Sequence, residues 1–113
     1  MTCIFCNIIT GQIPTTLRYQ DDQIIAIDDI TPQAPHHLLI IPREHIATIN
    51  DLNADHGALV GHMVLSARTL AQQLGIDKAG YRLVLNCNAD GGQAVYHIHL
   101  HLLGGRHMKW PPG

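Results

Sequence analysis

The chain has 113 residues, of which 46% are hydrophobic and 14% charged, and its formal net charge is −2. This length is typical of one domain with its own core, to which a subunit partner could add. The seven Lys and Arg residues are scattered along the chain, which argues against DNA or RNA as a partner.

The first residues, MTCIFCNIITG, contain neither a basic leader nor a long apolar run, and no stretch of the chain approaches the roughly 20 apolar residues that cross a bilayer. We therefore predict a cytoplasmic protein with no membrane partner. The three cysteines are an odd number, which argues against a disulfide framework. The spacing Cys3-x-x-Cys6 makes these two residues candidate metal ligands.

The N-terminal half of the chain predicts one short helix and three short strands. Residues 3–10 form the helix, which ends at Gly11 and Pro14. Apolar stretches bounded by turn residues predict the strands, which are Thr16–Gln20, Ile24–Asp28 and His37–Ile41. Asp21 and Asp22 join the first two strands as a hairpin.

The C-terminal half predicts one long helix and two more strands. Apolar residues recur at steps of four, four, three and four between 54 and 74, which is the pattern of one helical stripe that Gly75 can end. The strands are Tyr81–Asn86 and Tyr96–Leu103, with a glycine turn at 90–92 between them. Because the strands cluster rather than alternate with helices, we predict an α+β fold with a mainly antiparallel, five-stranded sheet.

Three histidines occupy alternate positions of the last predicted strand, at His97, His99 and His101. Successive side chains of a strand point to opposite faces, so the three histidines share one face and the intervening apolar residues share the other. A single histidine there would most often be an ordinary polar residue of a half-buried strand. Three in register indicate a metal ligand, a nucleophile or a proton carrier.

One zinc ion cannot hold all three histidines. At ~3.3 Å per residue the Cα atoms of His97 and His101 lie ~13 Å apart, too far for both rings to reach one tetrahedral ion with bonds of ~2.0–2.1 Å. At least one histidine in the row therefore has another task.

The run His97-Ile98-His99-Leu100-His101-Leu102-Leu103 resembles the His-x-His-x-His-x-x signature of the histidine triad superfamily of nucleotide hydrolases and transferases. Three further blocks, residues 28–37, 90–96 and 104–113, resemble its branch of histidine triad nucleotide-binding proteins. The resemblance covers essentially the whole chain. It implies a single histidine triad domain over residues 1–113 and a homodimer with a shared, extended sheet, in which the tail 104–113 contributes to the active site of the other subunit.

The resemblance also implies a reaction. The middle histidine, here His99, would attack the α-phosphorus of a purine nucleoside 5′-phosphoramidate and form a nucleotidyl-histidine, from which water releases the nucleoside monophosphate. His101 and His37 match the histidines that stabilise charge on the phosphate and handle the proton of the leaving group. No cofactor is expected to take part in the catalysis.

The same resemblance implies a nucleotide site. Asp29 would accept the ribose hydroxyls and Asn86 would contact the phosphate, while the turn at Gly92 and Gln93 would bring backbone N–H groups close to it. An apolar slot would hold either adenine or guanine, although Ile4 and Ile8 could equally be core residues. The remaining candidates are Phe5, Ile27, Ile30, Ala94 and Val95, together with Trp110, which would reach the leaving-group pocket of the partner subunit.

Ala94 departs from the family pattern, which commonly has serine at this position. The absent hydroxyl removes one hydrogen bond near the leaving group, worth ~0.5–1.5 kcal/mol. We therefore expect slower turnover or a different leaving-group preference.

A structural zinc site is a further implication of the resemblance. Some branches of the superfamily combine an N-terminal Cys-x-x-Cys with a histidine after a Pro-x-x-His turn and with the first histidine of the triad. Cys3, Cys6, His45 and His97 match these positions, and two thiolates with two imidazoles complete a closed tetrahedral site.

Three other functions remain open at this point. The same nucleophile could act on dinucleoside polyphosphates or transfer nucleotides. The chain could bind nucleotides with only vestigial catalysis, which Ala94 favours and the intact His37, His99 and His101 oppose. A metallohydrolase is the fourth reading, and it predicts that chelation abolishes activity.

Overall fold

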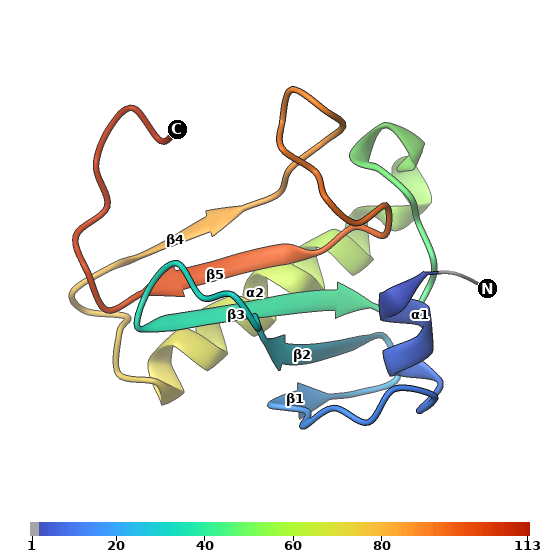
Figure 1. Ribbon diagram of the computed structural model, residues 1–113, viewed down its shortest axis with the longest axis horizontal. Coiled ribbons are helices and arrows are strands. Elements are labelled where there is room, and N and C mark those ends of the chain that lie inside the picture. The colour runs from blue at the N-terminus through green and yellow to red at the C-terminus, as the bar shows by residue number, and fades with distance from the viewer. Residues whose placement is uncertain (1–2) are drawn as a thin grey trace.

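The structure is a computed structural model that describes residues 3–113. It contains one antiparallel sheet with strand order β1-β2-β3-β5-β4, and a helix on each side of that sheet (Figure 1). The strands are β1 Tyr19–Gln20, β2 Ile24–Asp28, β3 His36–Pro42, β4 Tyr81–Val84 and β5 Leu100–Gly104. The helices are α1 Ile4–Ile9 and α2 Gly57–Gln73, and short 3-10 turns cover Ile49–Asp51 and Ala54–His56. The predicted α+β fold with five antiparallel strands, one long helix and one short helix is confirmed.

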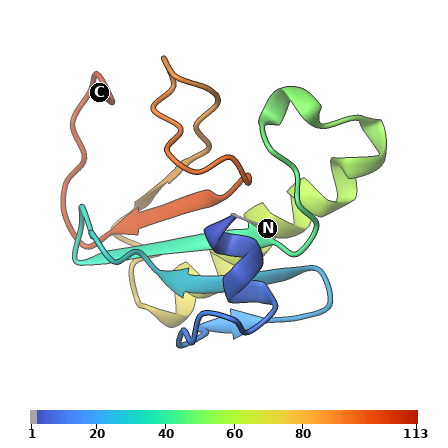
Figure 2. The ribbon, with the colours of Figure 1, turned by 45° about the vertical axis from the view of Figure 1, so that its right-hand side comes forward.

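Strand alternation divides the core into two layers. Leu38 and Ile40 of β3 pack with Leu100 and Leu102 of β5 against α2. The intervening residues of the central strands point to the opposite face, where they pack against α1 around the buried Phe5. Figure 2 shows α1 lying across this second face. The predicted histidines share the α1 side of the sheet, because they alternate with the residues that face α2.

The last strand begins later than predicted, at Leu100 rather than Tyr96. The pairing of β3 with β5 stops at Ile40 and Leu100, and the Ile98 N–H donates instead to the carbonyl of Ile46 at 2.8 Å. The side chains still alternate, since Ile98 lies in the α2 layer while His97 and His99 lie on the other side. His97 and His99 therefore occupy a strand-like extension beyond the sheet.

Three other boundaries differ from the prediction by two residues or more. Only Tyr19–Gln20 of the stretch Thr16–Gln20 forms a strand, although the Arg18 N–H still donates to the carbonyl of Ala26. The fourth strand ends at Val84 instead of Asn86, and residues 54–56 form a 3-10 turn before α2 begins at Gly57. Gly75 follows α2 with a φ of +73°, a left-handed conformation that suits glycine and ends the helix as predicted.

The β1–β2 hairpin is fastened to α2 through Asp21. Its carboxylate accepts hydrogen bonds from the Tyr19 hydroxyl at 2.8 Å, from His62 Nε2 at 2.6 Å, and from the backbone N–H groups of Gln23 and Ile24. Burial opposes ionisation of this carboxyl, but the four hydrogen bonds outweigh it and hold its pKa well below the usual range. Asp21 is therefore a charged anchor at the turn.

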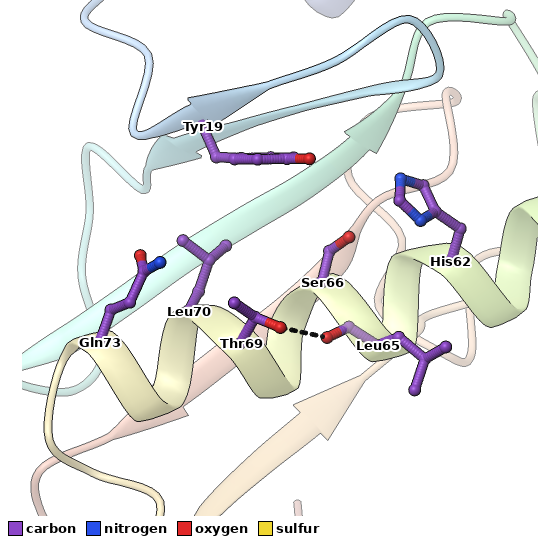
Figure 3. A pocket seen from close by; sticks show the side chains of 7 residues that line it. All are labelled: Tyr19, His62, Leu65, Ser66, Thr69, Leu70 and Gln73. Carbon is purple, nitrogen blue, oxygen red and sulfur yellow. Dashed lines mark hydrogen bonds between the residues drawn. The ribbon is translucent and has the colours of Figure 1, made fainter.

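A cavity of about 210 Å³ lies between the hairpin and α2. Figure 3 shows the Tyr19 ring extended over the helix above Ser66 and Leu70, with His62 at one end of the cavity and Gln73 at the other. None of the predicted site residues lines it. Among residues 3–113, no helix is both long and apolar enough to span a membrane.

Candidate active site

A pocket of about 300 Å³ opens on the α1 side of the sheet. It is lined by Ile4, Phe5, Ile8, Ile27, Asp28, Asp29, Ile30, Leu39, Asn86, Gly92, Ala94, Val95, His99 and His101. The fold thus brings together residues from α1, from the strands β2, β3 and β5, and from the loop before His97. All the predicted nucleotide-binding residues line this pocket except Gln93 and Trp110.

His99 is held with one ring nitrogen free. Its Nδ1 lies 2.8 Å from the main-chain carbonyl of His97, an acceptor only, so Nδ1 carries the proton and donates it. The side chain is 9% exposed, and the Phe5 ring packs edge-on against it with centroids 5.0 Å apart. In the neutral ring Nε2 is therefore unprotonated, as a nucleophilic nitrogen must be.

His37 and His101 form a chain of hydrogen bonds with a defined direction. The Gln33 backbone N–H donates to His37 Nδ1 at 3.0 Å, so a neutral His37 carries its proton on Nε2. That Nε2 donates to His101 Nδ1 at 2.8 Å, which in turn leaves the proton of His101 on its Nε2. His101 lines the pocket, so a ring N–H donor is available beside His99.

Burial keeps this chain neutral. Loss of solvent lowers the pKa of His37, partly offset by the negative charge of Asp29, whose Oδ2 lies 3.4 Å from His37 Nε2. Burial, reinforced by the neighbouring His99 and His37, lowers the pKa of His101 to about 4. Near pH 7 both rings are uncharged, and the direction of hydrogen bonding derived above applies.

Asp29 and Ile30 lie at the mouth of the pocket. Asp29 Oδ1 accepts the Thr31 N–H at 2.8 Å, which orients the carboxylate at the end of β2. Ile30 is 95% exposed although it lines the pocket, so its side chain is available to a ligand rather than used in the core. Phe5, in contrast, is buried, so it serves the core as well as the pocket.

The backbone N–H groups of Gly92 and Gln93, which were expected close to the phosphate, are both hydrogen-bonded within the turn. The Gly92 N–H donates to the carbonyl of Ala89 at 3.0 Å, and the Gln93 N–H donates to the carbonyl of Asn88 at 3.1 Å. These donors close the turn and are not directed at a ligand. The turn itself requires glycine at Gly91, where a Cβ would lie 2.5 Å from a main-chain oxygen.

Gln93 braces the loop instead of lining the pocket. Its side chain is buried, its Oε1 accepts the Asn88 N–H at 2.9 Å, and its Nε2 donates to the carbonyls of Ala47 and Val95 at 2.7 and 3.1 Å. Since every polar group of this amide is used internally, Gln93 supports the pocket wall. The sequence pattern alone could not separate this role from a contact with phosphate.

A second cluster joins the residues predicted to bind zinc. Cys3 Sγ lies 3.4 Å from His97 Nδ1, and Cys6 Sγ lies 3.3 Å from His45 Nδ1 and 3.6 Å from His97 Nδ1. The two Nδ1 atoms are 3.1 Å apart. All four donor atoms lie within 4.8 Å of one another.

These donors fit a tetrahedral zinc ion. Bonds of ~2.3 Å to sulfur and ~2.0–2.1 Å to nitrogen place neighbouring ligand atoms roughly 3.3–3.8 Å apart, close to the separations found here. His97 Nε2 donates to the carbonyl of Pro42 at 2.7 Å, which leaves Nδ1 unprotonated toward the cysteines. Burial and the neighbouring Cys3 raise the pKa of the Cys6 thiol, and a dication would favour the thiolate over the thiol.

Trp110 does not reach the pocket of its own chain. The C-terminal segment leaves β5 at the end of the sheet far from α1, and Trp110 is 83% exposed (Figure 1).

Sequence reasoning also missed residues that the structure adds to the site. Leu39 lines the pocket and could have been found from its alternation with His37, whereas the backbone N–H of Gln33 left no signal in the sequence.

Comparisons with known proteins identify the family of this chain. Residues 2–110 match the family described as "Scavenger mRNA decapping enzyme C-term binding". The chain is 53% identical over 103 residues to the purine nucleoside phosphoramidase of Escherichia coli, covering 91% of this chain and 87% of that protein. It is 48% identical over 110 residues to an HIT-like protein of Synechococcus elongatus, covering 97% and 96% of the two chains.

A solved structure of an HIT family hydrolase is also similar to this chain. The crystal structure of an HIT family hydrolase from Legionella pneumophila superposes with a TM-score of 0.97 at 58% identity, covering 99% of this chain and all of that one. Sequence and fold therefore agree over nearly the full length of the chain. The protein belongs to the histidine triad (HIT) family.

Proposed function

We propose that this protein is a purine nucleoside phosphoramidase, which cleaves the P–N bond of nucleoside 5′-phosphoramidates through a nucleotidyl-histidine at His99. The observation that carries the proposal is the hydrogen bond from His99 Nδ1 to the His97 carbonyl, which leaves Nε2 free in the pocket. The E. coli relative with 53% identity bears the name of this activity, which supports the choice of substrate.

The reaction has two displacements at phosphorus. In the first, the lone pair of His99 Nε2 forms a bond to the α-phosphorus while the P–N bond breaks, and the leaving nitrogen takes up a proton to depart as an amine. In the second, the oxygen of a water molecule replaces His99 on phosphorus. The water gives up a proton that balances the one taken by the amine, and the nucleoside monophosphate leaves.

His101 and His37 stabilise charge on the phosphate in both steps. His101 presents its Nε2–H to the pocket and can donate to a non-bridging oxygen, where negative charge builds in the transition state. His37 acts behind it by holding that tautomer. Because His101 is uncharged near pH 7, its Nε2–H acts as a hydrogen-bond donor, and the leaving nitrogen takes its proton from water.

The nucleoside would occupy the apolar side of the pocket. Ile4, Ile8 and Ile27 offer a slot for a base, and the Asp29 carboxylate at its mouth offers acceptors for ribose hydroxyls. An aliphatic slot distinguishes adenine from guanine poorly, so AMP and GMP conjugates are both expected substrates. Asn86 and Ala94 line the part of the pocket that also contains His99 and His101.

We also propose that Cys3, Cys6, His45 and His97 hold a structural zinc ion. When bound, the metal would crosslink α1 to the segment after β3 and to the segment before β5. The support is the fit of the four donor atoms to a tetrahedron and the bond from His97 Nε2 to Pro42. Catalysis requires no metal in this proposal.

A homodimer is the third part of the proposal. Strand β4 lies at one edge of the sheet and, within residues 3–113, pairs only with β5. An open edge of this kind can pair with a second copy, which would extend the sheet across the dimer. The exposed Trp110 would then be available to the pocket of the other subunit.

Kinetics with the purified protein test the proposed reaction. Wild type should hydrolyse a fluorogenic adenosine phosphoramidate faster than a dinucleoside polyphosphate, without inhibition by a chelator in the assay. His99→Ala should bind AMP but lose turnover, whereas His56→Ala, a histidine remote from the pocket, should retain it. Binding without turnover by wild type would favour the nucleotide-binding module, and rapid loss of activity on chelation would favour a metallohydrolase.

A further inference from the structure

Arg106 is joined to the candidate active site by a hydrogen bond to the main chain of Gln33. Its Nε donates to the Gln33 carbonyl at 2.9 Å, and its Nη1 donates to the carbonyl of His107 at 3.1 Å. Arg106 does not line the pocket. Its guanidinium therefore joins the segment after β5 to the loop between β2 and β3, which carries the N–H that binds His37.

The turn before Arg106 requires glycine. Gly105 has a φ of +93°, and a Cβ there would lie 2.9 Å from Pro35 Cβ. The chain after β5 thus passes directly against the β2–β3 loop, close enough for Arg106 to reach Gln33. This close approach makes the contact a consequence of the fold rather than of a flexible side chain alone.

Gln33 is held on both sides of its Cα. Its carbonyl accepts from Arg106, its side-chain amide donates to the carbonyl of Thr31 at 3.0 Å, and its N–H donates to His37 Nδ1 at 3.0 Å. The N–H decides which nitrogen of His37 carries the proton. That proton in turn decides the tautomer of His101 through the 2.8 Å contact between the two rings.

We infer that Arg106 is a positioning residue for the reaction, which fixes the Gln33 peptide and thereby keeps an N–H donor on His101 directed into the pocket. This inference rests on the proposed function. If Gln33 moved, His37 Nδ1 could bind water and take the proton, and Nε2 would then accept from His101 Nδ1–H. The lone pair of His101 Nε2 would face the phosphate oxygens, which repels the transition state instead of stabilising it.

The charge of Arg106 alone does not explain this role. A general attraction of Arg106 for an anionic substrate would lower KM, and a lysine at the position would preserve it. A fixed hydrogen bond from Nε to a carbonyl needs the planar guanidinium, which lysine lacks. Arg68 is a matched control, because it is exposed on α2, on the other side of the sheet from the pocket.

The experiment compares wild type with Arg106→Ala, Arg106→Lys and Arg68→Ala. Kinetics with the adenosine phosphoramidate should show a loss in kcat of about fivefold for both Arg106 variants, as expected for one hydrogen bond, with KM nearly unchanged. Arg68→Ala should behave as wild type. Long-range ¹H–¹⁵N spectra of the histidine rings at pH 7 should show His37 with Nε2–H in wild type and a mixture of tautomers in both Arg106 variants.

Unchanged ring spectra in Arg106→Ala, or full recovery of kcat in Arg106→Lys, would overturn the inference. The spectra need no substrate, so they test the positioning role even if wild type fails to cleave phosphoramidates. Failure of the proposed function would appear as absent turnover in wild type. Failure of the inference would appear as unchanged tautomers in the Arg106 variants.

Discussion

The main-chain carbonyl of His97 accepts the Nδ1 proton of His99 at 2.8 Å, while the ring of the same His97 faces Cys3 and Cys6. One residue thus contributes its side chain to the cysteine cluster and its backbone to the orientation of the nucleophile. Any change in the position of His97 must be transmitted to His99. The candidate zinc site and the candidate active site are therefore mechanically coupled.

Removal of one cysteine thiolate should abolish zinc binding and lower the thermal stability of the protein. We expect Cys3→Ser to lower the zinc content from about one ion per chain to a small fraction, and to lower Tm by at least ~5 °C, because a ligand that binds only the native state stabilises it. Cys87→Ser, a cysteine outside the cluster, should keep both. Elemental analysis of protein prepared without added zinc and a thermal melt are the measurements, and metal-free wild type would refute the site.

Replacement of Ala94 with serine should restore the missing hydrogen bond. Ala94 lines the pocket near His99 and His101, so a hydroxyl there can reach the leaving group. We expect Ala94→Ser to raise kcat/KM by roughly 2- to 12-fold on at least one phosphoramidate, from ~0.5–1.5 kcal/mol. Ala94→Gly, which adds no hydroxyl, serves as the control in steady-state kinetics. No gain on any leaving group tested would contradict the prediction.

Acid should destabilise the protein through His101. Its pKa in the folded state is about 4, below the ordinary value of 6.5, because the ring is buried beside two other histidines. The unfolded chain therefore binds this proton more readily, so the stabilisation is present above pH 6.5 and is lost as the pH falls toward 4. The full effect is on the order of 1–2 kcal/mol, because solvent screens part of the interaction at this half-buried ring.

The variant His101→Asn cannot take up this proton. Its free energy of unfolding, measured by urea titration at several pH values between 7 and 4, should fall less steeply with acid than that of wild type. Parallel curves for the two proteins across this range would show that His101 does not carry the effect.

Loss of the charge on Asp21, which lies far from the pocket, should lower the stability of the protein. Asp21→Asn keeps the shape of the side chain but loses the charge that accepts from Tyr19, His62 and two backbone N–H groups, so we expect a loss of ~1–3 kcal/mol. Asp22→Asn, at the neighbouring exposed position, is the control. Thermal unfolding gives the difference, and equal melting temperatures for the two variants would count against the anchor.

Periodicity predicted the parts of the fold in which one face is buried. Ile24–Asp28 is a strand with the predicted bounds. The predicted apolar stripe lies on α2 with its last member, Leu74, at the C-cap, because burial against a partner layer produces those repeats. The start of β5 was missed because β3 and β4 both stop pairing there, and the alternation of His97, Ile98 and His99 continues without a sheet. Side-chain pattern alone cannot report where backbone pairing ends.

The candidate active site was likewise predictable only in part. Side chains that line the pocket were predictable from residue types and from the resemblance to a family. The Gln33 N–H sets the tautomer of His37, and the carbonyls of His97 and Pro42 set those of His99 and His97. Every residue has such backbone groups, so the sequence does not single them out. Gln93 was misplaced for a related reason, since an amide suits a buried loop brace as well as it suits a phosphate.

The central claim is that His99 Nε2 bonds covalently to the nucleotide. Rapid-quench mass spectrometry of wild type with an adenosine phosphoramidate should detect a transient nucleotidyl adduct on the peptide that contains His99, and none in His99→Ala. Full hydrolysis by wild type with no adduct at any quench time, or an adduct on another residue, would contradict the account.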